Sequence, residues 1–312
     1  MVMAKNKWKG FIIKAVVFLV IGVGFDFLVG KIYRKLELKA LEHSPYGMVT
    51  EYTMWKVDAD VIIMGASEAQ HSYIPSYLEE QLDMTVYNCG KDGSRFYYQN
   101  AMINGILDRY SPKMIIWSLS PNELCAPSLD DKGRLSQLNP FYYNNFCREI
   151  LKTKSKYEPI KLISSSYSYN SRLFPLMYKI IMPDYQYEYG GYSPLYGTQD
   201  GLEIISRNWG GTYDEKVNEV FECTIERCFQ NDVQLVIVFT PRLERESHTE
   251  LTTYRQLKKT IEKYGVPIIE ELYHDKELMS INYFKDNAHL NDEGAKFFNQ
   301  KLSRILRDLK QR

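Results

Sequence analysis

The stretch DVIIMGAS, residues Asp60 to Ser67, decides the fold that we predict for this chain. Its four apolar residues, Val61 to Met64, are too few for a typical helix and stop at Gly65. This pattern is typical of a strand that is buried on both faces of a parallel sheet. Ligands bind beyond the carboxyl ends of such strands, where Ser67 stands. Because glycine and serine are also ordinary turn residues, Ser67 becomes a candidate nucleophile only if the chain supplies its partners.

Strands and helices alternate along the rest of the chain, on both sides of a middle segment that does not show this alternation. Further strands are predicted at 84–87, 114–117, 235–239 and 266–269, and helices at 74–82, 98–110, 217–228, 251–264 and from Asn291 onward. This alternation predicts an α/β fold, a three-layer α/β/α sandwich with a parallel, flavodoxin-like sheet. Asn291 is a good N-cap for the last helix.

Composition limits the class of protein. With 312 residues, of which 45% are hydrophobic, the chain can bury one good core and still carry an anchor and an insertion. Lys plus Arg equals Asp plus Glu at 39 each, so no net charge attracts nucleic acid, and we expect no nucleic-acid partner. The five cysteines show no CxxC or Cys/His metal spacing, so we expect neither a metal nor a cofactor.

An apolar segment from Phe11 to Tyr33 is long enough to cross a membrane as a helix, which takes about 20 residues. Lys14 lies near one end and can reach the interface, whereas Asp26 must lie near the opposite headgroups or face a partner. No small-x-small cleavage site follows the segment. We therefore predict an uncleaved signal anchor rather than a cleaved signal peptide.

The positive charges on the two sides of this segment balance, so they do not set its orientation. They are Lys5, Lys7, Lys9 and Lys14 before, and Lys31, Arg34, Lys35 and Lys39 after. We prefer a cytoplasmic amino-terminal tail with the large domain outside. The expected division is a tail and anchor at 1–39, a connector at 40–59 and an α/β/α domain at 60–312 with an insertion at about 125–211.

Asp286 and His289 stand immediately before the last predicted helix. An acid three residues ahead of a histidine can accept the Nδ1 proton and leave Nε2 free to act as a base toward a serine. A helix-capping acid beside a surface histidine, or a metal pair, would look the same. The other histidines form no cluster with metal spacing: His43, His71, His248 and His274. Of these, His71 follows Ser67 by four residues and is a weaker candidate for the base.

Four polar elements should therefore meet at the carboxyl edge of one sheet, because each follows a predicted strand or opens the last helix. Ser67 would attack an acyl carbonyl, His289 would take and return the proton, and Asp286 would hold the imidazole tautomer. The backbone N–H groups of Ser67 and Gly93 and the amide of Asn122 could donate to the oxyanion. Gly90 competes with Gly93 for this role.

These blocks resemble those of the SGNH, or GDSL-like, hydrolase superfamily. Gly65-Ala66-Ser67 looks like its first block, Gly93 like its second, Asn122 in Ser-Pro-Asn-Glu like its third, and Asp286-x-x-His289 like its fifth. The chain departs from the usual pattern at three positions: Ala66 replaces the Asp of Gly-Asp-Ser, Glu68 follows the serine, and Glu123 replaces an Asp. The resemblance implies the SGNH hydrolase fold and a serine hydrolase or acyltransferase acting on ester bonds without a cofactor.

Similar proteins with a single amino-terminal anchor include those of bacterial cell-surface polymer acylation, such as alginate acetylation and teichoic-acid alanylation. By that resemblance the chain would be a single-pass membrane protein whose catalytic domain is extracytoplasmic, periplasmic or at the cell surface. Its substrate would be an acyl ester or glycan of the cell envelope. A membrane acyltransferase is among the partners that the resemblance allows.

The insertion carries eleven of the 25 tyrosines. They are Tyr142, Tyr143, Tyr157, Tyr167, Tyr169, Tyr178, Tyr185, Tyr187, Tyr189, Tyr192 and Tyr196. A tyrosine side chain has an aromatic face and a terminal hydroxyl group, and it therefore suits contacts with sugars and with other proteins. The same side chains can equally pack in the core of the insertion itself. The sequence leaves the substrate-binding residues unknown.

The leading hypothesis is a membrane-anchored serine esterase or O-acyltransferase that transfers acetyl or another short acyl group of a cell-envelope glycan through an acyl-Ser67 intermediate. The alternative is a non-catalytic binding or scaffold component of an envelope polymer acylation assembly. A lipid esterase is a third option, and this function would require an apolar groove for the acyl chain. Fold membership does not decide among them.

Overall fold

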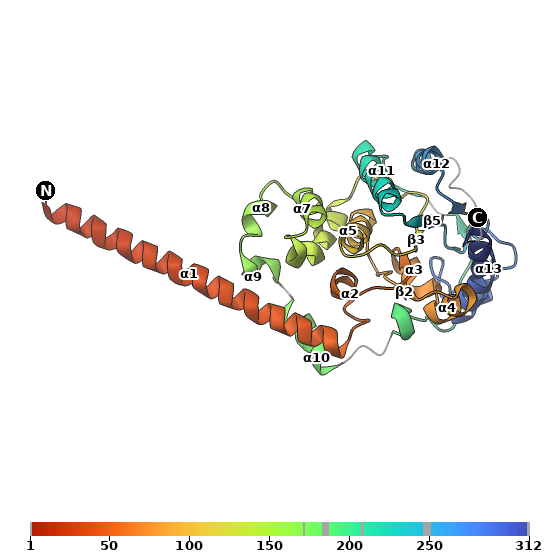
Figure 1. Cartoon of the computed structure of the whole chain (residues 1–312), viewed down its shortest axis with the longest axis horizontal. Coiled ribbons are helices and arrows are strands. Elements are labelled where there is room, and N and C mark those ends of the chain that lie inside the picture. Colours follow the sequence, from red (N-terminus) through yellow and green to blue (C-terminus); the bar gives the residue numbers. More distant parts are fainter. Residues whose placement is uncertain (1, 171, 183–186, 207–208, 246–250, 311–312) are drawn as a thin grey trace.

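The computed structural model describes residues 2–170, 172–182, 187–206, 209–245 and 251–310. Its centre is a parallel five-stranded sheet in the order β2-β1-β3-β5-β7 (Figure 1). The strands are β1 (Val61–Met64), β2 (Val86–Asn88), β3 (Met114–Ser118), β5 (Gln234–Val238) and β7 (Ile268–Ile269). This is the flavodoxin-like order, and the predicted α/β sandwich is confirmed.

Side chains alternate between the two faces of the sheet, so each strand contributes to two cores. Ile62, Ile115 and Trp117 pack with α5 (Phe96–Leu107), α11 (Glu215–Gln230) and α12 (Thr252–Tyr264). Val61, Ile63 and Ile116 pack with α4 (Pro75–Leu82) and α13 (Asp292–Lys310) on the opposite face. Strand residues buried on both faces account for the continuous apolar runs in the sequence.

Outside the insertion, two helices of the described residues lie where the sequence predicts none. Helix α3 (Ser67–Ser72) begins at the candidate nucleophile, in what was expected to be a turn. Helix α2 (Val49–Trp55) lies in the segment expected as a connector, and its Met54 joins the core beside α5. The last helix begins as predicted, because the Asn291 side chain accepts from the Gly294 N–H at 2.9 Å.

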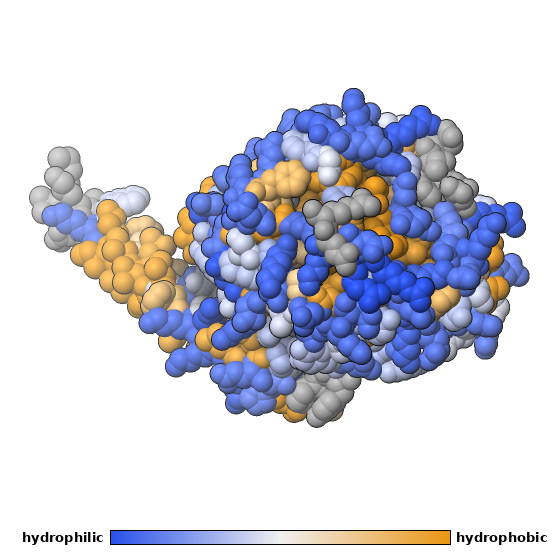
Figure 2. All heavy atoms as spheres, turned by 45° about the vertical axis from the view of Figure 1, so that its right-hand side comes forward, coloured by the Kyte–Doolittle hydropathy of each residue, from blue (hydrophilic) through white to orange (hydrophobic). Residues whose placement is uncertain are grey.

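The amino-terminal helix α1 (Val2–His43) projects from the domain, and its apolar stretch stands out from a mainly hydrophilic body (Figures 1 and 2). The part from Trp8 to His43 is long and apolar enough to cross a membrane, and its most apolar window has no buried residue. The helix therefore extends beyond the predicted span of 11–33. Of the two alternatives left open for Asp26, the structure shows contacts within the chain: its carboxylate accepts from the backbone N–H groups of Ser165 and Ser166.

The middle of the chain is mostly short helices rather than part of the sandwich. They are α6 (Leu129–Arg134), η1 (Leu135–Phe141), α7 (Asn145–Lys152), α8 (Glu158–Lys161), α9 (Ser165–Ser168), α10 (Leu173–Ile181) and η2 (Tyr189–Gly191). Helices α9 and α10 pack on α1, and α7 packs on α5. Strands β4 (Ile205–Ser206) and β6 (Glu244–Arg245) form a separate parallel pair, and η3 (Ile281–Tyr283) precedes the last helix. Tyr185 and His248 lie outside the described residues.

Candidate active site

Ser67 is placed at the carboxyl edge of the sheet by a tight turn after β1. A side chain at Gly65 would put its Cβ 2.9 Å from the Ser118 carbonyl oxygen, so only glycine lets β1 turn this close to β3. Ser67 then opens α3, where the first backbone N–H groups of a helix have no partner within the helix. The position lies between β1 and β3, the point where the strand order reverses.

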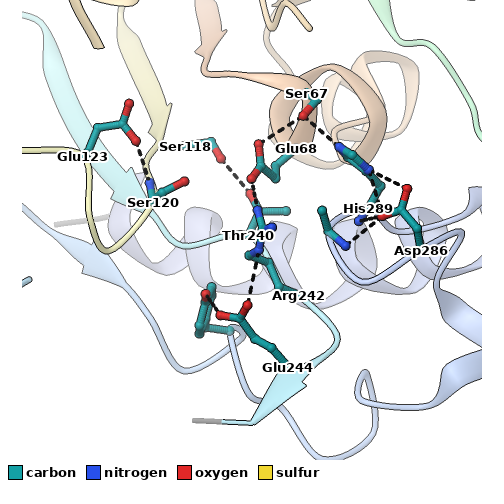
Figure 3. A network of polar contacts seen from close by, with 12 residues as sticks. Ser67, Glu68, Ser118, Ser120, Glu123, Thr240, Arg242, Glu244, Asp286 and His289 are labelled. Carbon is teal, nitrogen blue, oxygen red and sulfur yellow. Dashed lines mark hydrogen bonds and ion pairs between the residues drawn. The ribbon is translucent and has the colours of Figure 1, made fainter. Parts of the chain in front are cut away.

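Ser67, His289 and Asp286 form a continuous hydrogen-bonded chain (Figure 3). The Oγ of Ser67 lies 2.7 Å from Nε2 of His289, and Nδ1 of His289 lies 2.9 Å and 3.0 Å from the two carboxylate oxygens of Asp286. Because Nδ1 faces a carboxylate, it carries the proton, and Nε2 is free to accept the hydroxyl proton of Ser67. This arrangement can activate a serine as a nucleophile.

The Asp286 carboxylate is held by its own loop. Its Oδ1 accepts from the backbone N–H of Ala288 at 2.7 Å and of His289 at 3.0 Å. Burial raises the pKa of Asp286, but the hydrogen bonds from His289 and the backbone outweigh it and lower the pKa to about 2. Asp286 is therefore ionised at neutral pH and can orient the imidazole.

The three expected oxyanion donors do not all face the same cavity. Ser67 and Gly93 both line the pocket at the catalytic chain, and Gly93 has a positive φ of 66° that favours glycine. Asn122 lines a neighbouring cavity instead, where its Nδ2 donates to the Gly210 carbonyl at 3.1 Å. The N–H of Gly90 donates to the Asn88 side chain at 2.9 Å, so the geometry favours Gly93 over Gly90.

A charged network that sequence reasoning missed lies beside Ser67. Glu68 is 3.4 Å from Ser67 Oγ through Oε2 and pairs with Arg242 through Oε1 (Figure 3). The buried Arg242 also faces Glu244 at 3.7 Å, and Glu244 accepts from the Tyr273 hydroxyl at 2.6 Å. Arg242 lies just after β5, and this position was the available signal in the sequence, because charged residues that follow parallel strands gather at the same edge of the sheet.

His71 lies close to His289, with 5.6 Å between the ring centroids, but has its own partners. Its Nδ1 is 2.6 Å from the Ser193 carbonyl and its Nε2 is 3.0 Å from Asp92. Neither nitrogen contacts Ser67. The structure therefore brings His289, and not His71, within reach of the serine hydroxyl.

The pocket at Ser67 has a volume of about 250 Å³ and is mostly polar. The insertion contributes Asp130, Asp131 and Arg134 from α6 to the lining of this pocket. None of the insertion's tyrosines among the described residues lines this pocket. Within the same described ranges no group of His, Cys, Asp and Glu side chains is arranged to hold a metal ion.

No protein-family model and no curated protein matches this chain. The solved structures that are similar to it include a proposed acylhydrolase of Bacteroides fragilis, with 9% identity, a TM-score of 0.39 and coverage of 80% of this chain and 86% of that one. They also include a proposed lipolytic protein of the G-D-S-L family of Desulfitobacterium hafniense, with 9% identity, a TM-score of 0.40 and coverage of 78% of this chain and 98% of that one. Both similarities are too distant to carry an argument about the site.

Proposed function

We propose that this chain is a membrane-anchored serine esterase or O-acyltransferase that works through an acyl-Ser67 intermediate on an acyl ester of a cell-envelope glycan. One observation carries the proposal: Ser67 Oγ lies 2.7 Å from His289 Nε2, and the same ring contacts Asp286 through Nδ1. A serine from one part of the chain has no structural need to be aligned in this way with a base and an orienting acid 222 residues away.

In the first half-reaction the Ser67 oxygen attacks the ester carbonyl while His289 takes the hydroxyl proton. The N–H groups of Ser67 and Gly93, which line the same pocket, are the donors for the oxyanion. Collapse of the tetrahedral intermediate expels the alcohol, which takes the proton from His289, and leaves the acyl group on Ser67. Water then completes an esterase reaction, and a sugar hydroxyl completes a transfer.

The surroundings of Ser67 favour a polar alcohol portion for the ester. Charged side chains line the pocket, among them Arg95, Arg134, Asp130 and Glu68, and such groups suit the hydroxyl-rich surface of a glycan. The apolar stretch of α1 would hold the domain at a membrane, which agrees with an envelope substrate, an extracytoplasmic domain and a membrane acyltransferase as partner.

A non-catalytic scaffold is the second candidate, and the position of Asn122 favours it. Its amide is bound to the Gly210 carbonyl and faces away from the Ser67 pocket. A site with one oxyanion donor fewer loses about 10²–10³ in rate, so an envelope assembly could retain this fold for binding.

Labelling with a fluorophosphonate tests the two candidates. We expect the full-length protein in lipid nanodiscs to be modified at Ser67, because His289 can accept the hydroxyl proton as the phosphorus–oxygen bond forms. The modified residue would be identified by mass spectrometry. Ser67→Ala should not be labelled.

Ser120→Ala is the matched control, because Ser120 lines the same pocket without contacting His289 and its variant should keep the wild-type labelling rate. A folded wild-type protein that is not labelled at Ser67 would contradict the esterase and support the scaffold.

A further inference from the structure

A second cavity of about 220 Å³ lies next to the Ser67 pocket. Three residues line both: Arg95, Glu123 and Asp131. The Arg95 Nε contacts Asp131 Oδ1 at 3.2 Å, so this ion pair stands at the boundary between the two cavities. The two cavities therefore adjoin at a short polar rim.

The interior of the second cavity is apolar and built on rigid elements. Phe96 and Tyr97 come from α5, Leu135 from η1 and Val217 from α11, and all four are buried. Phe96 stacks on Trp117 of β3 with 5.5 Å between the ring centroids. A cavity with such walls exists before a ligand arrives and needs little ordering on binding.

Three of the polar side chains that line the second cavity already have partners. Asn122 donates to the Gly210 carbonyl, Ser128 donates its hydroxyl to Asp131, and a Glu123 oxygen accepts from the Ser120 N–H. Burial raises the pKa of Glu123 to about 7, which reduces its charge at the boundary. A sugar would lose its hydrogen bonds to water here without replacing them, whereas an alkyl chain would not.

We infer that this second cavity binds the acyl chain of the ester whose carbonyl is attacked by Ser67. The inference rests on the proposed function and refines it: the acyl group is a straight chain of a few carbons rather than acetyl alone. A volume of about 220 Å³ is below the roughly 300–1,000 Å³ of sites for drug-sized ligands, so a long lipid chain does not fit. The glycan alcohol remains on the polar side of the boundary.

Phosphonofluoridates that differ only in the alkyl chain on phosphorus test this assignment. With each probe the Ser67 oxygen displaces fluoride from phosphorus, and its proton passes to His289, so the probes share one chemical step. We expect the labelling rate of the full-length protein in nanodiscs to rise by about fourfold for each methylene from methyl to butyl, the effect of burying one methylene.

Ala126→Trp would fill the cavity from its exposed mouth. We expect this variant to lose the dependence of the labelling rate on chain length. Leu129→Trp is the matched control, because Leu129 is 88% exposed and does not line the cavity, so it should behave like the wild type. A wild-type rate that does not change with chain length, or a dependence that survives in Ala126→Trp, would overturn the assignment.

Thermal unfolding of Ser67→Ala separates this assignment from the proposed chemistry, because that variant binds an ester without reacting. Methyl hexanoate should raise its Tm more than methyl acetate does, and adding Ala126→Trp should remove the difference. The same shift without labelling at Ser67 by any probe would refute the proposed function and support the cavity. Chain-independent labelling at Ser67 without the shift would refute the cavity and support the function.

Discussion

At the scale of the residue, two histidines lie side by side and their hydrogen-bond partners distinguish them. His71 has two partners, the Ser193 carbonyl and the Asp92 carboxylate. The carbonyl oxygen accepts hydrogen bonds and cannot donate them, and the same holds for the carboxylate when Asp92 is ionised. Burial lowers the pKa of His71, but these two acceptors outweigh it and raise the pKa. Both ring nitrogens of His71 are therefore engaged with acceptors other than Ser67.

We therefore expect His289→Ala to lower the rate of fluorophosphonate labelling by at least about 10²-fold, the usual contribution of a general base. His71→Ala should lower it by less than about tenfold, because His71 acts only through its neighbours. His43→Ala is a control at an exposed position on α1. The rates would be measured side by side by mass spectrometry, and equal losses in the two histidine variants would contradict the assignment.

At the scale of the element, the insertion packs against helix α1. Tyr33 of α1 stacks on Tyr169 with 5.0 Å between the ring centroids, and Glu37 pairs with Arg172 at 2.8 Å. The Asp26 carboxylate also accepts three hydrogen bonds from residues at the start of α9. Helices α9 and α10 of the insertion are too short to be stable alone, so α1 supplies the surface on which they form.

Asp26→Ala should loosen this junction. The Asp26 carboxylate accepts from Ser164 Oγ at 2.8 Å and from the N–H groups of Ser165 and Ser166 at 2.7 Å and 2.9 Å. Losing a cap of this kind costs about 1 kcal/mol, so amide hydrogen exchange at these two positions should become roughly fivefold faster. Glu42→Ala, at an exposed site on the same helix, should leave the exchange unchanged. No difference between the two variants would show that the cap is dispensable.

At the scale of the whole molecule, the side of the membrane that the domain faces is a separate question from the fold. All five cysteines are free; Cys89, Cys147 and Cys228 are buried, Cys125 is partly exposed, and Cys223 on α11 is exposed. Cys223 is therefore a natural reporter of topology.

We expect a membrane-impermeant maleimide to label Cys223 in cells with a sealed cytoplasmic membrane and a permeable outer layer, because the domain is proposed to be extracytoplasmic. Labelling would be read by mass spectrometry of the Cys223 peptide, with Cys223→Ser as the control. Modification of Cys223 only after lysis would place the domain in the cytoplasm and contradict the proposed envelope substrate.

The positions of the five strands could be predicted because the apolar runs are short, buried on both faces and separated by helical stripes. The ends differed by one or two residues, as for β2, which begins at Val86 rather than Met84. Helix α2 was not predicted, because its burial depends on packing against α5 and not on a pattern within seven residues.

The sequence by itself determined where each strand ends along the chain. It thus determined which polar residues share one edge of the sheet: Ser67, Gly93 and the Asp286–His289 pair. It could do so because strand connectivity restricts where a residue after a strand can lie. Only the tertiary structure decided which way the side chains point. Asn122 turns to a carbonyl 88 residues away, and Glu68 meets Arg242 across 174 residues. Such contacts depend on long-range packing, which leaves no local signal in the sequence.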